Sequence, residues 1–116
     1  MRDIEFRGKR IDNGQWVYGC INIMQNGNTY IFHYSTQFAV IPETVGQYTG
    51  LHDKNGKKIY ERDIDGSDVP MVICYEYGAY GLKYSIKDKY FDPNIRWGQL
   101  KIIGNIYDNP ELLREE

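Results

Sequence analysis

The sequence is poor in the residues that most often bind metals. It contains only two cysteines and two histidines. His33 and His52 stand at no ligand spacing, so a zinc site would require both Cys20 and Cys74 to lie close to the histidines in the fold. We therefore expect no metal site and no cofactor.

Common catalytic and nucleotide-binding motifs are also missing. Ser35 lies near His33, but no Gly-x-Ser-x-Gly elbow exposes a hydroxyl. Neither G-x-x-x-x-G-K-[ST] nor G-x-G-x-x-G occurs, so the usual loops that cradle phosphates are absent. These absences argue against an enzyme, and the least supported alternative uses Glu43 or Asp53 as an acid–base group.

Neither sign of charge dominates, and no apolar run is long. The net charge is -2, which gives no global positive field for nucleic acid or anionic lipid. No window approaches the ~20 apolar residues of a membrane helix, and residues Met1 to Glu5 lack the pattern of a secretory signal. We expect a cytoplasmic protein without membrane contact. In that reducing compartment Cys20 and Cys74 should be buried free thiols, with a disulfide or a reactive nucleophile as the alternative.

An acidic cluster superficially resembles a calcium-binding loop. It consists of Asp63, Asp65 and Asp68 with Gly66 among them. In a calcium loop the third acidic residue precedes the glycine and a glutamate closes the loop, whereas here Tyr75 occupies the closing position. We expect a solvated turn at this cluster, with a cation site as the alternative.

Tyrosine and Asn-Gly pairs are abundant. The chain contains 11 tyrosines and is 41% hydrophobic, a composition that can bury enough apolar surface to fold. Its length fits one domain over residues 1–116, because folding units cluster near ~100 to 150 residues. Asn13-Gly14, Asn26-Gly27 and Asn55-Gly56 fit type I′ hairpin turns, which need positive φ at two successive residues.

Between these turns lie runs that are rich in β-branched and aromatic residues. Residues Trp16 to Met24 carry apolar side chains on both faces, which is typical of a central strand covered on both sides. Short strands joined by tight turns predict a mainly β fold, either a small rolled sheet or an SH3-like β-barrel. About seven short strands are expected: Ile4 to Ile11, Trp16 to Met24, Thr29 to Tyr34, Lys58 to Ile64, Pro70 to Tyr77, Tyr80 to Ile86 and Leu100 to Tyr107.

Few segments favour helix. Pro42 to Gln47 predicts a single helical turn or a 3-10 piece. Asn109 as N-cap, followed by Pro110 and Glu111, predicts a short C-terminal helix. The expected loops are Ser35 to Phe38, Gly66 to Asp68 and Tyr90 to Trp97.

Three blocks of the sequence resemble the YopX family of small phage and prophage proteins. They are Phe6 to Arg10 with Gly14 to Gly19; Val40 to Glu61, VIPETVGQYTGLHDKNGKKIYE; and Ile103 to Leu112. The resemblance implies a single mainly β YopX-like domain that acts in a bacterial host cell. The family has no assigned biochemical activity, so the resemblance implies a fold and not a reaction.

One position departs from the family pattern. The family usually has glycine where this chain has Arg62. If that glycine provides positive φ, Arg62 carries a strain of about 1 kcal/mol, or the local backbone differs.

The aromatic and basic segment from Tyr75 to Trp97 is the first candidate for an interaction surface. Tyr, Trp and Arg are enriched at protein interfaces, which favours a non-enzymatic protein-binding or self-assembling module. Its partner would be a second copy, giving a homo-oligomer, or a phage or host protein. The alternative is a nucleic-acid-binding module in which rings stack on bases and lysines contact phosphates. The candidate residues are Tyr75, Tyr77, Tyr80, Lys83, Tyr84, Lys87, Lys89, Arg96 and Trp97.

The family-like segment holds a second set of candidates. A ligand site there would need at least two polar side chains that converge on a pocket. The glycines and apolar residues of this segment favour a structural role instead. The candidate ligand-facing residues are Glu43, Gln47, Thr49 and Asp53.

Overall fold

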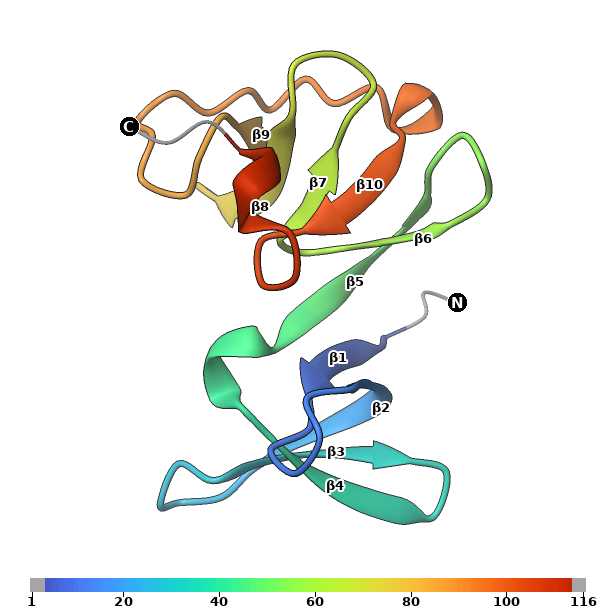
Figure 1. Cartoon of the computed structure of the whole chain (residues 1–116), viewed down its shortest axis with the longest axis vertical. Helices are drawn as coiled ribbons and strands as arrows, with labels where there is room; N and C mark the ends of the chain where they lie inside the picture. The colour runs from blue at the N-terminus through green and yellow to red at the C-terminus, as the bar shows by residue number, and fades with distance from the viewer. Residues whose placement is uncertain (1–3, 114–116) are drawn as a thin grey trace. The chain divides into compact units, whose positions relative to one another are not determined.

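The fold is mainly β, as predicted. A computed structural model describes residues 4–113, which form ten strands in two antiparallel sheets together with three short 3-10 helices. Figure 1 shows the strands along the chain. The sheet orders are β4-β3-β2-β1-β5-β6 and β10-β7-β8-β9. Among the residues that the structure describes, no helix has the length and apolar character needed to cross a membrane.

The chain divides into two compact units, residues 1–48 and residues 49–116. In the first unit, β2 pairs with both β1 and β3, which confirms its predicted central position. The elements of this unit are β1 (Phe6–Lys9), β2 (Trp16–Ile23), β3 (Thr29–His33), β4 (Thr36–Val40), the 3-10 helix η1 (Pro42–Thr44) and the first residues of β5 (Gly46–His52).

The sheet of the first unit rolls over a small apolar core. Val17, Ile31 and Val40 are buried between its strands. The outer edge of β4 meets the end of β1, because the Ile11 amide donates to the Ala39 carbonyl (3.0 Å). The described strands do not close into a barrel, so the SH3-like barrel is not confirmed.

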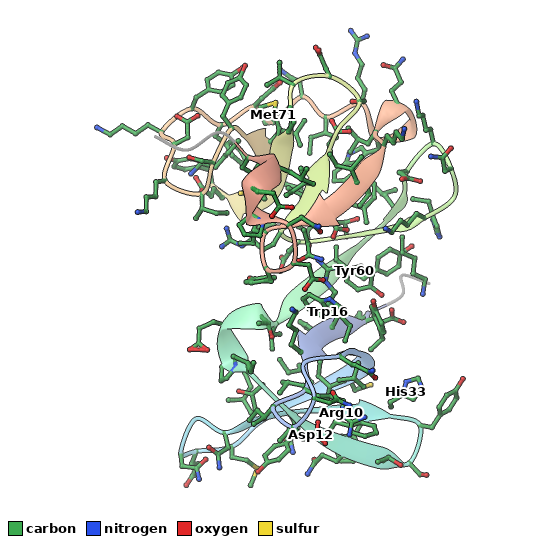
Figure 2. The ribbon with its side chains drawn as sticks, viewed as in Figure 1. Arg10, Asp12, Trp16, His33, Tyr60 and Met71 are labelled. Carbon is green, nitrogen blue, oxygen red and sulfur yellow. The ribbon has the colours of Figure 1, made fainter. Side chains whose placement is uncertain are left out.

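A bidentate ion pair lies in the turn between β1 and β2. Arg10 Nε and Nη2 donate to Asp12 Oδ1 and Oδ2 at 3.0 and 2.7 Å (Figure 2). This hydrogen bond is the main reason that the pKa of Asp12 lies below its usual value. The Asp12 side chain is 65% exposed, so solvent screens the pair and it contributes little to stability.

In the second unit, β7 and β8 are the inner strands of a four-stranded sheet. Its core consists of Ile59, Ile73, Leu82, Leu100 and Ile102. The elements of this unit are the rest of β5, β6 (Lys58–Tyr60), β7 (Asp63–Asp65), β8 (Met71–Glu76), β9 (Ala79–Lys83), η2 (Trp97–Gln99), β10 (Ile102–Asn105) and η3 (Pro110–Leu112).

The Asn-Gly turns differ from the predicted type. Gly14, Gly27 and Gly56 have positive φ, but the asparagines before them do not. At the second pair, the Gly27 amide donates to the Met24 carbonyl (2.9 Å). Gly27 is the only residue of this loop with positive φ. A type I′ turn needs two such residues, so that prediction is wrong. Two successive positive φ values occur instead at Tyr77 (55°) and Gly78 (79°), between β8 and β9.

Two strands lie where none was predicted. The predicted loop Ser35 to Phe38 overlaps β4, which pairs with β3 across a two-residue turn at Tyr34 and Ser35. β5 follows directly after η1, the 3-10 piece that the sequence predicted. β4 is only five residues long, and β5 contains two glycines, which are uncommon in strands, so the sequence signal for both is weak.

The predicted C-terminal helix is a three-residue 3-10 helix, η3. Asn109 does precede Pro110, but its side chain makes no cap hydrogen bond. Its Oδ1 accepts the Asn105 amide instead (3.3 Å), and the chain leaves helical geometry at Leu113.

Only one of the two cysteines is buried. Cys74 is 2% exposed, whereas Cys20 is exposed on the outer face of β2. The prediction of two buried thiols is therefore wrong for Cys20, and so is the prediction that both faces of β2 are covered. Burial raises the pKa of Cys74, although the charges of Arg62 and Lys83 partly oppose this.

The exposure difference predicts stepwise labelling of the thiols. Native protein should react rapidly with a maleimide at Cys20, and Cys74 should react only after unfolding, because a buried protonated thiol is a poor nucleophile. Mass spectrometry with and without denaturant measures this. Cys20→Ser is the control and should show no rapid reaction, and two rapid reactions in the native protein would contradict the assignment.

Arg62 has positive φ (72°), which is the first of the two alternatives that the departure from the family pattern left open. It divides the predicted strand Lys58 to Ile64 into β6 and β7. The Arg62 amide donates to the Ile73 carbonyl (2.8 Å), and the Arg62 carbonyl accepts the Ile106 amide (3.1 Å). These two backbone bonds hold the residue in its left-handed conformation.

Glycine at position 62 should give a more stable protein than alanine at the same position. Arg62→Gly is expected to exceed Arg62→Ala in free energy of unfolding by about 1 kcal/mol, because both variants lose the guanidinium but only glycine relieves the strain. Urea denaturation of the two variants measures this difference. An alanine variant as stable as the glycine variant would show that the backbone here is not strained.

Candidate protein-binding surface

A row of aromatic rings extends from the core of the second unit to solvent. Tyr75 and Tyr80 are cross-strand partners in β8 and β9, and their rings meet edge to face with centroids 5.0 Å apart. Tyr80 in turn meets Trp97 at 6.2 Å, and both pack against the apolar core. Tyr80 and Trp97 are therefore half-buried, while Tyr75 is 56% exposed at the outer end of the row.

A second pair of rings lies over the opposite face of β9. Phe91 covers Gly81, where any side chain would overlap the Phe91 ring. Two backbone hydrogen bonds of 2.9 Å between Leu82 and Asp92 fix this segment. Phe91 makes an edge contact with Tyr77 at 5.7 Å. Phe91 is thereby the support of the tyrosine at the hairpin tip.

Basic residues and a third pair of rings follow β9. Tyr84 and Tyr90 stack with centroids 5.9 Å apart, and Lys87 and Lys89 are exposed between them in sequence. Lys83, in contrast, is buried: its Nζ donates to Glu76 Oε2 (2.9 Å) and to a backbone carbonyl. Six of the nine predicted surface residues are exposed: Tyr75, Tyr77, Tyr84, Lys87, Lys89 and Arg96.

The tip of the β8–β9 hairpin holds a tyrosine in an unfavourable conformation. Tyr77 has φ of 55° and is 86% exposed. In the first unit, Tyr34 has φ of 56° and is 93% exposed, with its ring against His33. Residues with a Cβ avoid positive φ, and glycine or asparagine is the usual occupant of such a position. Both tips thus present a ring at a position that is strained for tyrosine.

A pocket of about 300 Å³ opens beside Tyr84. Its floor includes Met71, labelled in Figure 2, and the buried residues Leu82 and Leu100. The sequence singled out Tyr84 and Arg96 for an interaction surface and Asp65 and Asp68 as an acidic cluster. It did not indicate that they share one pocket, because they come from separate parts of the chain. The remaining lining residues are Asp65, Ser67, Asp68, Val69, Asp92, Asn94 and Gln99.

Comparison with known proteins identifies the family. The family model described as YopX protein matches residues 4–114. The chain belongs to the YopX family. Comparison with curated protein sequences gives no match.

Two solved structures share the fold. The crystal structure of the protein EF1440 from Enterococcus faecalis has a TM-score of 0.61 at 21% identity, over 98% of this chain and all of that one. The structure of yopX from Bacillus subtilis has a TM-score of 0.56 at 19% identity, over all of this chain and 99% of that one. At such identities the likeness shows the fold alone.

The polar candidates of the YopX-like segment divide between the two units. Glu43 is exposed in η1, and Gln47 is half-buried opposite Phe6 in β1, both within the first unit. In the second unit Thr49 is buried, and its hydroxyl donates to the Ile59 carbonyl (2.8 Å).

Asp53 is buried and accepts three backbone hydrogen bonds. Its Oδ1 accepts the amides of Asn55 and Lys57 at 2.9 Å, and its Oδ2 accepts the Ile102 amide at 3.0 Å. Burial alone would raise the pKa of this carboxyl, but the three amides and the Lys57 charge together lower it below its usual value. The arrangement joins the β5–β6 turn to β10.

Asp63 and Asp65 are also buried, contrary to the predicted solvated turn. Asp63 Oδ2 accepts the Tyr60 amide at 2.8 Å. Asp65 Oδ1 accepts the amides of Ser67 and Lys101, and its Oδ2 accepts the Ser67 hydroxyl. A carboxylate offers several acceptor sites, and here they satisfy amides that short strands leave without partners. Only Asp68 of the cluster is exposed.

Stability should depend on pH through Asp53. Its pKa is lowered by folding, so its contribution is fully present above the unfolded value of 3.8 and is lost as the pH falls below that value. Asp53→Asn should lower the free energy of unfolding by about 2 kcal/mol at neutral pH. The difference in free energy of unfolding between this variant and the wild type should become smaller as the pH falls below about 4.

Urea denaturation between pH 3 and pH 7 measures this effect. Asp68→Asn is the matched control, because Asp68 is exposed and accepts no hydrogen bond from the described residues. It should leave stability nearly unchanged. A gap between Asp53→Asn and the wild type that stays constant over the whole pH range would contradict the role given to the Asp53 charge.

Proposed function

We propose that this YopX-family protein is a non-enzymatic protein-binding module. Its contact surface is the tip of the β8–β9 hairpin at Tyr77 with the exposed residues Tyr75, Tyr84 and Arg96. The observation that carries the proposal is that Tyr77, at once strained and 86% exposed, stands in the same hairpin as the 56% exposed Tyr75.

Strain at an exposed tyrosine is not explained by folding. A residue with a Cβ at positive φ costs about 1 kcal/mol or more. The ring of Tyr77 offsets little of this cost, because it makes one edge contact with the Phe91 ring. Glycine or asparagine would form the same turn with less strain. A ring retained at this tip is therefore best explained by a contact outside the chain.

The chemistry of the surface suits a protein partner. Tyrosine presents a large and rigid ring with a polar tip at a small cost in conformational entropy. Tyr75 adds a second half-exposed ring, and Arg96 adds a guanidinium that pairs with no carboxylate among the described residues. Such rings and guanidinium groups are the usual centres of protein interfaces.

The favoured partner is a second copy of this chain, and the other candidates are phage or host proteins in the bacterial cytoplasm. The balanced charge of the chain, -2 overall, allows copies to approach without strong repulsion. A homo-oligomer needs no component beyond the chain itself, which makes self-association the first measurement to carry out.

Nucleic-acid binding is the second candidate function. The stacked pair of Tyr84 and Tyr90 beside Lys87 and Lys89 favours it, because rings and cations together bind single strands. The burial of Lys83 removes one of the expected phosphate contacts. A mobility shift that weakens steeply between low and moderate salt would support this candidate over protein binding.

Tyr77→Asn tests the proposed surface. Asparagine tolerates positive φ, so the variant should fold with equal or slightly higher stability while it lacks the ring. Self-association, measured by light scattering over a range of concentrations, should be at least about tenfold weaker, as expected for an interface hot spot. Pull-down from nuclease-treated host lysate with both forms as bait extends the test to other partners.

Tyr34→Asn is the matched control, since it removes an exposed ring at positive φ from a hairpin turn of the first unit, outside the proposed surface. It should leave association unchanged. A wild-type protein that stays monomeric at every concentration and captures the same proteins as Tyr77→Asn would contradict the proposed function.

A further inference from the structure

The pocket beside Tyr84 combines an apolar floor with a charged rim. Leu82 and Leu100 are buried at its base, and Met71 is half-buried beside them. At about 300 Å³ it lies at the lower end of the range for small-molecule sites. The space therefore suits a single long side chain better than a drug-sized ligand.

The charge of the lining is negative and is not neutralised within the chain. Three carboxylates, of Asp65, Asp68 and Asp92, face one cation, Arg96. The hydrogen bonds that Asp65 accepts come from two amides and a hydroxyl, all of them uncharged. None of the four charged residues forms an ion pair with another residue that the structure describes. The pocket thus has a formal excess of negative charge.

Two of these carboxylates have oxygen atoms that accept no hydrogen bond from the residues that the structure describes. Asp92 Oδ1 accepts the Asn94 amide (2.9 Å), and its Oδ2 accepts no hydrogen bond within the described part of the chain. Asp68 is exposed at the rim, and both of its oxygens are without a donor there. Tyr84, 41% exposed, adds a ring at the same opening. Carboxylates beside an aromatic ring form a site for an organic cation.

We propose that this pocket receives a basic side chain, arginine or lysine, of a protein partner. The inference rests on the protein-binding function proposed above and specifies the chemistry of the partner. A basic side chain is amphipathic: its methylene stem covers the floor at Met71 and Leu82, and its charged head reaches Asp68 and Asp92. An acidic or a purely apolar side chain matches only one part of this lining.

The charge of Arg96 should affect the affinity of the pocket for a basic ligand in a direction that can be measured. Its guanidinium lies in the lining of the same pocket and opposes the entry of a second cation. Removing its charge should therefore strengthen the binding of a basic group and weaken the binding of an acidic one. If the pocket instead bound a carboxylate through Arg96, the same change would weaken the binding of its ligand.

The experiment uses the full chain and three small probes. They are Nα-acetylarginine amide, the neutral isostere Nα-acetylcitrulline amide and the acidic Nα-acetylglutamate amide. Each probe is titrated into isotope-labelled protein, and the amide NMR signals of Asn94, Arg96 and Leu100 are followed. The arginine probe should bind at least about tenfold more tightly than the citrulline probe, since a charged hydrogen bond is worth more than a neutral one.

Variants of the charged lining residues test whether these residues cause the preference for the arginine probe. Asp68→Asn with Asp92→Asn should weaken the arginine probe about tenfold, whereas Arg96→Gln should strengthen it. Asp92→Asn keeps the oxygen that accepts the Asn94 amide, so the loop should stay folded. Asp68→Asn alone, which breaks no hydrogen bond within the described chain, should give a smaller loss in the same direction.

The results distinguish failure of the pocket proposal from failure of the proposed protein-binding function. Equal binding of the arginine and citrulline probes, or preference for the glutamate probe, would overturn the pocket proposal even if Tyr77→Asn abolishes self-association. Arginine selectivity in a protein that has no partner and does not self-associate would overturn the partner named here together with the protein-binding function, while the cation site would stand.

Discussion

The second unit depends on three buried carboxylates that bind backbone amides. Asp53 accepts the amide of Ile102, and Asp65 accepts that of Lys101, so each connects segments far apart in sequence. The strands β6 and β7 have three residues each and offer few ladder hydrogen bonds. Buried amides without partners would be costly, so the carboxylates replace bonds that longer strands would make.

This use of carboxylates limits the chemistry of the site. Asp53 is, with Glu43, one of the two acid–base candidates from the sequence, yet its two oxygens already accept three amides. A lowered pKa also leaves it ionised and without a proton to donate at neutral pH. The groups that remain available to a partner lie at the surface, on the rings of Tyr77 and Tyr84 and on the charged rim of the pocket.

Local features of the fold could be predicted from the sequence, and non-local ones could not. The strands between the turns and the 3-10 piece at Pro42 each depend on residues within a few positions. β4 and β5 were missed because β4 is short and β5 contains two glycines, so that pairing with partner strands is needed to identify them. The buried aspartates were missed for a related reason, since their partners are backbone amides up to 49 positions away, which no side-chain pattern reveals.

Of the candidate site, the exposed tyrosines followed from the sequence, and the pocket did not. The segment from Tyr75 to Trp97 is rich enough in rings that some had to reach the surface. Which of its cations would be free was not determined locally: Lys83 is buried against Glu76 and a backbone carbonyl, while Arg96 lies in the pocket lining. Asp68 precedes this segment and Asp92 lies within it, and the two line one pocket only in the folded second unit.

Two residues of the second unit share the same strained conformation, and their surroundings explain it differently. Arg62 is half-buried, its amide and carbonyl bond to β8 and to the segment after β10, and its guanidinium lies 3.8 Å from Cys74 Sγ. Its neighbours in the fold therefore hold it in place. Tyr77 is almost fully solvated, and its ring rests only edge-on against Phe91. Since both carry a similar strain, the residue whose strain the fold does not offset is the one whose side chain is best explained by a partner.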